Sequence, residues 1–450
     1  MQLKEKTHKG LYIKNYGCQM NVYDGDRMHE LLSPLNYKRV DDPNDAELII
    51  LNTCHIREKA TEKIYSELGR LKKRFNNPKK NIKIAVAGCV AQAEGEELVR
   101  RAPLVDLVFG PLTYHQLPEM IQEITDRKKE RNKALVNIEF PERDKFLSLP
   151  ERANKKETVS AFLSVQEGCD KFCTFCVVPY TRGVESSRPA VQIISEAKEL
   201  INNGAKEIIL LGQNVNAWNG EGLSGNRWDF SELIKRLSEL NIDRLRFTTS
   251  HPKDMNNKLI RCFFNIPKLQ PYLHLPVQSG SNKILKAMNR GYSKQQYIEI
   301  IEKIRDIRPD IAISGDFIVG FPGETDDDFN DTMDIIKKVK YAHAYSFKYS
   351  PRPGTPAASM DLQIDEETKR ERLFKLQELI TASMKTFNES FLGRTLEILV
   401  EKQRFEENKI SGRSPYLQSV HMEGHNSLIG ELVNVDILKI RENSLLGTIV

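Results

Sequence analysis

Apolar and polar positions follow two alternating periods along most of the chain. In the first part, short apolar runs typical of buried parallel strands stand between longer stretches with helical spacing. We expect strands at residues 11–16, 48–52 and 82–88 and helices at residues 22–35, 56–75 and 93–101. This βαβα order predicts a doubly wound α/β domain over residues 9–126, with a parallel sheet covered by helices on both faces.

A second alternating region covers residues 155–387. Its six expected strands lie at residues 159–166, 207–212, 244–249, 273–277, 311–319 and 344–349, with helices between them, such as 191–202 and 294–307. Six βα units predict a partial (βα)6 barrel, in which functional residues gather at the carboxyl ends of the strands. Residues 127–154 are polar, contain two prolines and are expected to form a linker.

The last part, residues 388–450, follows an expected charged helix from residue 366 to 387. Short β-like runs at residues 395–400, 428–433 and 434–438, separated by Gly and Asn turns, predict a small OB-like β-barrel. Such barrels often bind nucleic acid. Residues 390–450 contain seven Lys/Arg and eight Asp/Glu, so any RNA contact there depends on a local face and not on net charge.

The composition of the chain is typical of a soluble globular protein. A chain of 450 residues, 40% hydrophobic and 29% charged, is expected to be soluble, with two or three domains. We expect a cytoplasmic protein with reduced thiols and no membrane contact, because an apolar signal core and a run of ~20 apolar residues are both missing. The net charge of +5 is a weak hint of an anionic partner. Basic runs at residues 70–80 and 127–133 can meet phosphates, but solvated helix ends explain them equally well.

The strongest chemical signal is a C-x3-C-x2-C motif formed by Cys169, Cys173 and Cys176. Three thiolates hold three corners of an iron–sulfur cube and leave one iron open, whereas clusters that only carry electrons are normally held by four cysteines. The motif therefore predicts chemistry at an open iron. A zinc site completed by a distant residue and chance spacing of free thiols are the alternatives.

A second set of cysteines is spread over the first domain. Cys18, Cys54 and Cys89 each follow an expected strand, and loops at the carboxyl ends of neighbouring strands converge in a doubly wound sheet. These three thiols can hold another cluster, with Gly17 and Gly88 allowing close backbone approach. The alternative is that each is a small buried residue. The remaining cysteine, Cys262, has no companions and is expected to pack in the core.

Three sequence words sharpen the interpretation: GCQMN at residues 17–21, VVPYTRG at residues 177–183 and HLPVQSGS at residues 274–281. With the two cysteine sets and the three-part layout, they resemble the radical S-adenosylmethionine methylthiotransferases, in particular the MiaB-type tRNA enzymes. The last part of the chain resembles the TRAM domain of this family. The resemblance extends over nearly the whole chain and is weakest in the linker.

The resemblance implies a transferase with two [4Fe-4S] clusters. Cys169, Cys173 and Cys176 would hold a cluster whose open iron binds S-adenosyl-L-methionine and splits it to a 5′-deoxyadenosyl radical. An auxiliary cluster on Cys18, Cys54 and Cys89 would present sulfur, and a second S-adenosylmethionine would supply the methyl group. The product would be a methylthio group on carbon 2 of N6-isopentenyladenosine beside the anticodon in tRNA. The expected partners of this monomer are the tRNA anticodon loop, an electron-donor protein and a sulfur donor that the sequence does not identify.

Further residues are candidates for the cofactor site. Gln213 and Asn214 can hydrogen-bond the methionine or ribose part, and the loop from Gly320 to Glu324 can cradle the adenosine, although a bare Gly-Pro turn fits that loop equally well. Phe172 and Phe175 can shield the cluster from water, or they can simply pack in the loop. Arg182 can bind a phosphate or a carboxylate, or it can form a surface ion pair. For His251 and His274 a structural role is favoured.

Two rival functions follow from the same residues. Relatives within the resembled family act on threonylcarbamoyl-adenosine in tRNA or on an aspartate of a ribosomal protein, and the VVPYTRG word favours the isopentenyl substrate. A non-catalytic RNA-binding module with structural zinc is the rival from another class.

Overall fold

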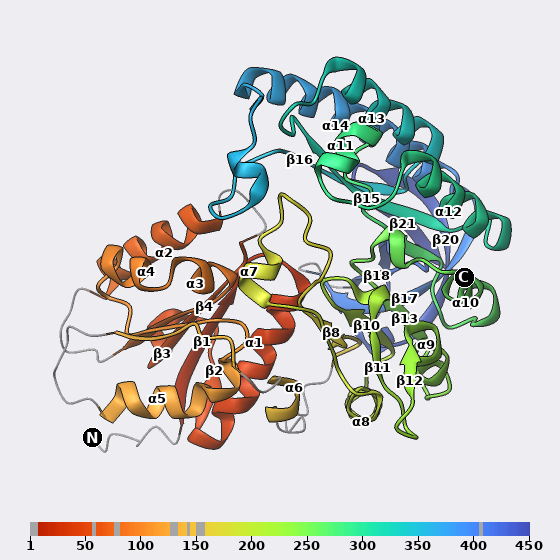
Figure 1. Cartoon of the computed structure of the whole chain (residues 1–450). Helices are drawn as coiled ribbons and strands as arrows, with labels where there is room; N and C mark the ends of the chain where they lie inside the picture. The colour runs from red at the N-terminus through yellow and green to blue at the C-terminus, as the bar shows by residue number, and fades with distance from the viewer. Residues whose placement is uncertain are drawn as a thin grey trace. The chain divides into compact units, whose positions relative to one another are not determined.

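The computed structural model describes residues 8–55, 60–75, 82–126, 134–141, 145–149, 158–404 and 408–450. The chain divides into two compact units (Figure 1). The N-terminal unit contains residues 1–154, 167–170 and 177–186, and the second unit contains the remainder. Within the described ranges, every helix is too short or too polar to cross a bilayer.

The N-terminal unit contains a six-stranded sheet of order β2-β1-β3-β4-β5-β6, in which all neighbours are parallel. Its strands are β1 (Lys9–Asn15), β2 (Tyr37–Arg39), β3 (Leu48–Thr53), β4 (Lys83–Gly88), β5 (Leu107–Phe109) and β6 (Leu135–Asn137). The strand order reverses beside β1, so a switch point lies between β1 and β3. The predicted doubly wound α/β class is confirmed for this unit.

Helices cover both faces of this sheet because its central strands are apolar on both faces. In β3, Leu48 and Ile50 belong to one buried cluster and Ile49 and Leu51 to the other. The first cluster includes residues of α1 (Gln19–Leu32) and α5 (Leu117–Asp126), and the second includes residues of α2 (Ala60–Arg74), α3 (Cys89–Glu94) and α4 (Glu96–Arg101).

Three predictions in this unit need correction or completion. The helix expected at residues 93–101 begins at Cys89 and is interrupted at Gly95, whose φ of +50° ends α3. Part of the expected linker is ordered within this unit, because β6 pairs with β5 and is followed by α6 (Lys145–Ser148). The start of the helix expected at residue 56, the end of the first basic run and all of the second lie outside the described residues.

The second unit contains two three-stranded parallel sheets, ordered β13-β10-β7 and β14-β15-β16. Their strands are β7 (Ser160–Ser164), β10 (Glu207–Leu211), β13 (Arg244–Phe247), β14 (Tyr272–His274), β15 (Ala312–Val319) and β16 (His343–Lys348). All six strands fall where the sequence predicts them, and together they form the expected partial (βα)6 core.

Helices connect the strands of this core and share one apolar cluster with them. The principal helices are α8 (Ala190–Asn202), α9 (Phe230–Ser238), α10 (Asn257–Asn265), α12 (Lys294–Ile307), α13 (Asp326–Val339) and α14 (Glu366–Glu389). Several begin at capping boxes, as at Ser293 before α12 and Thr325 before α13, where side chains bind the otherwise unpaired amides. Shorter elements are α7 (Val178–Arg182), α11 (Asn282–Ala287), β8 (Gln166–Glu167), β9 (Ser186–Ser187), β11 (Asn219–Glu221) and β12 (Arg227–Asp229).

The C-terminal strands form a closed barrel of order β17-β18-β19-β21-β20, which confirms the predicted small β-barrel. Its strands are β17 (Thr395–Gln403), β18 (Lys409–Arg413), β19 (Ser419–Glu423), β20 (Leu432–Arg441) and β21 (Ser444–Ile449). The two strands expected at residues 428–433 and 434–438 are one continuous strand, β20, because its buried Val435 and Ile437 keep a single alternation.

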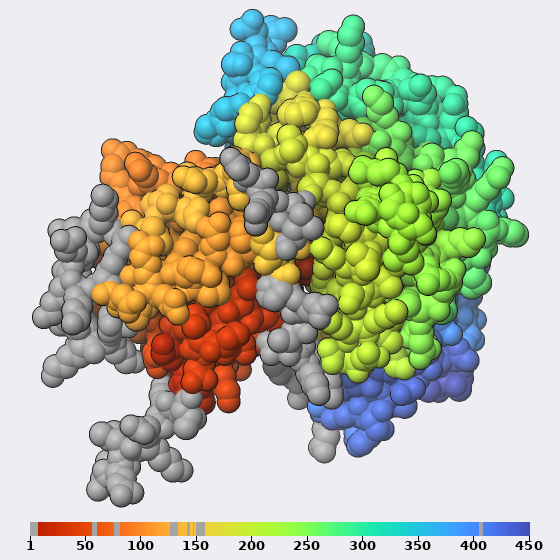
Figure 2. Space-filling model, turned by 60° about the horizontal axis from the view of Figure 1, so that its bottom comes forward, coloured from red at the N-terminus to blue at the C-terminus, as the bar shows by residue number. Residues whose placement is uncertain are grey.

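Two arginines of β13 bind the closed barrel to the core. Arg244 donates to the carbonyl oxygens of Arg413 and Glu397, both at 2.8 Å. Arg246 donates to the carbonyl oxygens of Ser414 and Pro415 at 2.9 and 2.6 Å. Figure 2 shows the closed barrel (blue) beside the green residues of the core. Because both arginine side chains are 1% exposed, this connection is a buried one.

Candidate active site

The compact set, which we define as Cys169, Cys173 and Cys176, lies in one loop of the chain. The amide of Cys169 donates to the carbonyl of Gly183 at 3.3 Å, and the amide of Cys176 donates to the carbonyl of Cys173 at 3.0 Å. Gly168 precedes the loop with φ of +73°, and a Cβ there would lie 1.9 Å from the Val184 oxygen. Only glycine therefore fits at the entry to the loop.

The segment after α11 fixes the middle of this loop. Thr174 donates from its amide to the carbonyl of Met288 at 3.1 Å and from its hydroxyl to the carbonyl of Ala287 at 2.9 Å. The side chain of Asn289 donates to the carbonyl of Phe172 at 3.0 Å. Phe172 has φ of +48°, which is costly for a bulky residue. These hydrogen bonds hold the loop in a conformation it would not adopt alone.

Arg290 contacts the compact set directly. Its guanidinium is buried and donates to Cys173 Sγ at 3.3 Å, to the Pro276 carbonyl at 2.8 Å and to the Tyr292 hydroxyl at 2.9 Å. Burial opposes its charge, but Tyr292 and Cys173 outweigh that cost and raise the pKa of Arg290 above its ordinary value. Arg290 therefore stays protonated beside the thiol. The sequence offered no signal for this residue.

The edge set, which we define as Cys18, Cys54 and Cys89, lies at the carboxyl ends of β1, β3 and β4. Cys18 is the N-cap of α1 and Cys89 is the first residue of α3. A Cβ on Gly17, whose φ is +105°, would lie 2.2 Å from the Cβ of Cys54. A Cβ on Gly88, whose φ is +88°, would lie 2.3 Å from the Thr53 oxygen. Both glycines permit the close approach of neighbouring strand ends that the sequence predicts.

The thiols of the edge set interact with one another and with Arg182. A hydrogen bond with Cys54 lowers the pKa of Cys18 against the effect of burial, and the charge of Arg182 lowers it further. Burial raises the pKa of Cys89, while Arg182 opposes that rise. Cys54 thus lies beside Cys18, and the guanidinium of Arg182 acts on both Cys18 and Cys89.

Arg182 belongs to a buried and balanced ionic network. It is 3% exposed and donates to Asp24 at 2.9 Å and to Glu167 at 2.7 Å. Lys145, also buried, forms ion pairs with the same two carboxylates. Two cations thus face two carboxylates. Of the interpretations offered by the sequence, Arg182 is a carboxylate ligand, and it lies in the interior and not in a surface pair.

Gln213 and Asn214 are held in place after β10. The amide oxygen of Gln166 accepts from both backbone amides, at 2.8 and 3.1 Å. The Asn214 side chain donates to Asp254 at 2.8 Å, and Asp254 pairs with Lys171 of the compact loop at 2.7 Å. Asn214 thus supports that loop, and the side chain of Gln213 is half-buried.

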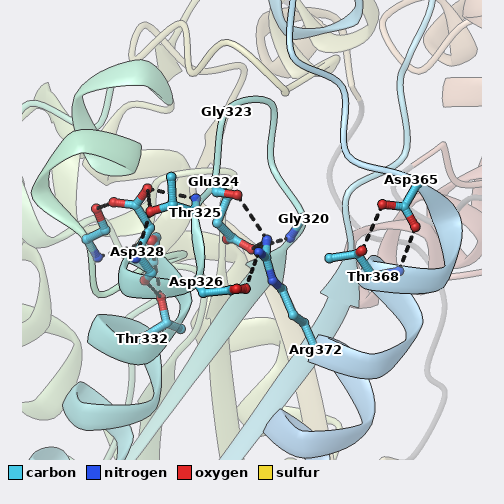
Figure 3. Close-up of polar contacts among 12 residues, drawn as sticks. Gly320, Gly323, Glu324, Thr325, Asp326, Asp328, Thr332, Asp365, Thr368 and Arg372 are labelled. Carbon is cyan, nitrogen blue, oxygen red and sulfur yellow. Dashed lines mark hydrogen bonds and ion pairs between the residues drawn. The ribbon is translucent and has the colours of Figure 1, made fainter.

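Glu324 connects the loop after β15 to α14 (Figure 3). One of its carboxylate oxygens accepts from the Gly320 amide and from Arg372, both at 2.8 Å, and Arg372 also binds Asp326 at 2.8 Å. A Cβ on Gly320 would lie 2.3 Å from Lys369 Cγ, which explains the glycine. Burial raises the pKa of Glu324. Sequence reasoning missed Arg372, which lies far along the chain in α14.

The remaining candidates have structural surroundings. His251 accepts from the Lys253 amide at 3.2 Å, and burial with nearby cations lowers its pKa to about 2, so it is neutral. His274 contacts the Ser314 hydroxyl at 3.1 Å. Phe175 packs against a buried apolar cluster, while Phe172 is 53% exposed. Cys262 is buried as expected, and burial raises its pKa to about 11.

Both cysteine sets suit iron–sulfur clusters in their chemistry. Each supplies three thiols, which leaves one corner of a four-iron cube for another ligand. Each also has a buried guanidinium, which offsets the negative charge of thiolates. Within the described ranges, three His, Cys, Asp or Glu side chains are nowhere arranged around a single metal ion.

Three family models match the chain in the order of its parts. "Uncharacterized protein family UPF0004" matches residues 10–110, the "Radical SAM superfamily" matches residues 163–336, and the "TRAM domain" matches residues 389–450. Among solved structures, the radical S-adenosylmethionine methyltransferase TsrM from Kitasatospora setae aligns with a TM-score of 0.56 at 13% identity, covering 78% of this chain and 75% of that one. The cobalamin-dependent radical enzyme OxsB aligns with a TM-score of 0.54 at 14% identity, covering 83% of this chain and 56% of that one. These structural likenesses show a shared fold.

Curated relatives match over almost their full length. Proteins named tRNA-2-methylthio-N(6)-dimethylallyladenosine synthase from Agrobacterium fabrum and Maricaulis maris are both 54% identical, covering 98% of this chain and 97% and 98% of theirs. The protein of the same name from Rickettsia rickettsii is 53% identical, covering 98% of this chain and 99% of its own. The chain therefore belongs to the tRNA-2-methylthio-N(6)-dimethylallyladenosine synthase family of radical S-adenosylmethionine enzymes.

Proposed function

We propose that this protein attaches a methylthio group to carbon 2 of N6-isopentenyladenosine beside the anticodon of tRNA. The near-complete match to relatives named for this synthesis carries the proposal. One S-adenosylmethionine serves as radical source and a second as methyl donor. An aromatic C–H at this position is not acidic enough for a side-chain base, so the difficult chemistry belongs to the cofactor while the protein positions and shields it.

The two cysteine sets divide the work in this proposal. Cys169, Cys173 and Cys176 would hold a [4Fe-4S] cluster, which would supply the electron that splits S-adenosylmethionine. The edge set would hold a second [4Fe-4S] cluster, which would present the sulfur to be inserted. The residues around the compact set act by position: Asn289 fixes the loop backbone, and Arg290 holds a positive charge at Cys173.

We assign Gln213, Gly320 and Glu324 to cofactor binding as part of the same proposal. The backbone of Gln213 is fixed by Gln166, which supports a hydrogen bond from its side chain to the methionine or ribose part. Glu324 acts through the loop, because its contacts with Gly320 and Arg372 shape the backbone on which the adenosine would rest.

A basic groove on the closed barrel supports contact with the tRNA backbone. We define it by Arg404, Lys409, His421 and Arg441, which line a cavity of about 500 Å³. Burial lowers the pKa of His421, and Arg404, Arg441 and other nearby cations lower it further. Arg404, Lys409 and Arg441 thus line one groove together with a single acidic residue among those described, Glu423, and give it a local excess of positive charge that suits contact with phosphates.

The setting of the reaction completes the proposal. We place the enzyme in the cytoplasm as a monomer that receives single electrons from a donor protein, while the sulfur source is left open. The anticodon loop of tRNA is single-stranded, so its adenosine can leave the stack at little cost.

Nucleoside analysis of tRNA tests the function. Cells that lack this chain should accumulate N6-isopentenyladenosine and lose its methylthio derivative. Restoring the gene should restore the product, and restoring a Cys262→Ala form should do so too, because this matched control removes one thiol and keeps both sets. If the deletion instead removes the methylthio group from threonylcarbamoyl-adenosine or from a ribosomal protein, the proposed substrate is wrong.

The docking surface has its own test. Arg441→Gln should weaken tRNA binding several-fold and reduce the salt slope by about one unit, because one phosphate contact is lost. Lys337→Gln, an exposed cation on α13, is the control and should bind tRNA as the parent does. If both variants bind tRNA equally well, the basic groove is not the surface that docks tRNA.

A further inference from the structure

Each cysteine set has one buried arginine, but the two arginines differ in what balances their charge. Arg182 beside the edge set is paired with Asp24 and Glu167. Arg290 beside the compact set is hydrogen-bonded to a carbonyl, a hydroxyl and the thiol of Cys173. In the described part of the chain, no carboxylate forms an ion pair with Arg290.

The surroundings of Arg290 leave its charge unscreened. Tyr292, which contacts its Nε, donates its own hydroxyl proton to the Val277 carbonyl at 2.9 Å, as a neutral phenol does. His251 is neutral, as shown above. Lys171 is nearby, but its charge is balanced by Asp254 at 2.7 Å. The interior around Cys173 therefore carries one net positive charge, and a low-dielectric interior strengthens its effect.

The surroundings of Arg182 have the opposite character. Lys145 and Arg182 contribute two positive charges, and Asp24 and Glu167 contribute two negative charges within the same buried network. The two carboxylates therefore oppose the charge of Arg182 that acts on the edge set. A cluster held there would feel only part of that charge.

We propose, resting on the two-cluster function above, that Arg290 sets the reduction potential of the compact-set cluster and so directs incoming electrons to it. A one-electron donor adds one negative charge to that cluster and no other bond forms or breaks. Arg290 keeps its proton throughout, so the added charge is offset without proton uptake. Charge and hydrogen bonds near the cysteine sulfurs are established determinants of cluster potential. Arg290 thus acts by placing a positive charge beside Cys173. Because the charge of Arg182 is paired with carboxylates, the edge-set cluster is harder to reduce than the compact-set cluster.

An anaerobic redox titration of the full-length, reconstituted protein tests this proposal. The reduced cluster is followed by EPR in a Cys18/Cys54/Cys89→Ala background, where only the compact set can hold iron. Three changes are compared in that background: Arg290→Gln, Arg290→Lys and Tyr292→Phe. The first removes the charge, the second keeps the charge but cannot reproduce all three hydrogen bonds of the guanidinium, and the third removes a neutral partner.

The expected result separates charge from structure. At a fixed poised potential, Arg290→Gln should lower the ratio of reduced to oxidised cluster about tenfold, which corresponds to about 59 mV for a one-electron couple. Arg290→Lys and Tyr292→Phe should stay within about threefold of the parent by the same relation. Iron content should remain the same in all four proteins.

Two outcomes overturn the proposal. The first is a ratio of reduced to oxidised cluster that does not change in Arg290→Gln. The second is a fall in that ratio in Arg290→Lys as large as in Arg290→Gln, which would show that Arg290 acts only through its hydrogen bond to Pro276. If Arg290→Gln fails to bind iron, the lysine variant decides: a parent-like ratio supports the role of charge and a shifted one overturns it. A parent protein without any cluster would instead refute the proposed function itself.

Discussion

The compact set and the edge set use the same number of thiols but are assembled in different ways. Cys169 to Cys176 spans eight residues of one loop, held mainly by the segment that follows α11. The edge set exists only after β1, β3 and β4 have paired. The compact set is therefore local in sequence, and the charge of its arginine is not paired with a carboxylate in the described part of the chain. The edge set depends on the pairing of the sheet, and the charge of its arginine is paired. The difference indicates that ligand number alone does not define what a cysteine site does.

The largest effect should come from removing each set in turn. Cys173→Ala should abolish deoxyadenosine formation, while Cys89→Ala should preserve it and abolish sulfur insertion, because the proposed function assigns the activation of S-adenosylmethionine to the compact set alone. The parent should bind about eight irons per chain, from two four-iron clusters. Iron analysis and chromatography of the products measure both quantities. If Cys89→Ala still inserts sulfur, the proposed division of roles between the compact set and the edge set is wrong.

A second effect distinguishes the two arginines by stability. Arg182→Gln removes one of the two cations that face Asp24 and Glu167, and leaving a buried charge uncompensated in this way costs about 3–5 kcal/mol. Arg290→Gln removes hydrogen bonds to neutral groups and should cost only about 1–3 kcal/mol. Urea unfolding of the cluster-free proteins, followed by circular dichroism, compares the two midpoints. The comparison fails if Arg290→Gln proves the more damaging change.

A third prediction concerns the glycine that lets the edge set assemble. Gly17→Ala forces a φ of +105° on alanine and puts its Cβ against Cys54, at a backbone cost of about 1–3 kcal/mol. Iron should fall from about eight to about four per chain, with deoxyadenosine formation retained. Gly69→Ala is the matched control: with nothing within 4 Å of a Cβ in α2, it should stabilise by about 0.5–1 kcal/mol. Full iron in Gly17→Ala would show that the strand ends can separate freely.

The smallest effect is a difference in thiol reactivity in the metal-free protein. The lowered pKa of Cys18, about 6, means that its thiolate is present above that pH and is lost as the pH falls below it. Iodoacetamide should therefore label Cys18 at a rate that levels off above neutral pH. Cys262, with a pKa of about 11, should remain slow until strongly alkaline pH. Mass spectrometry of the two peptides gives both rates, and equal rates at neutral pH would contradict the expectation.

Most of the fold was predictable because its main strands lie within apolar runs. The six strands of the (βα)6 core and helices such as α12 (Lys294–Ile307) carry their pattern locally. By contrast, β2, β5 and β6 have three residues each and exist through pairing with neighbours, whereas the equally short β14 overlaps the expected strand at residues 273–277. The break at Gly95 and the merged strand β20 also depend on packing that a local pattern does not contain.

The candidate site was predictable where spacing or strand ends marked it. Both cysteine sets could be named in this way, and the structure places Cys18 beside Cys54 and both Cys18 and Cys89 near Arg182. Arg290 could not, because its contact with Cys173 joins positions 117 residues apart and no motif surrounds it. The burial of Arg182 was likewise not foreseeable, because Lys145, Asp24 and Glu167 come from three separate segments.

The arginines of β13 have a consequence for how a long substrate is measured. Arg244 and Arg246 anchor the C-terminal barrel through backbone carbonyls, which do not change with side-chain rotamers. The barrel is thus a fixed arm of the core and not a module on a swinging tether. If the barrel binds tRNA as proposed, the fixed distance between the barrel and the core would determine which nucleotide reaches the core.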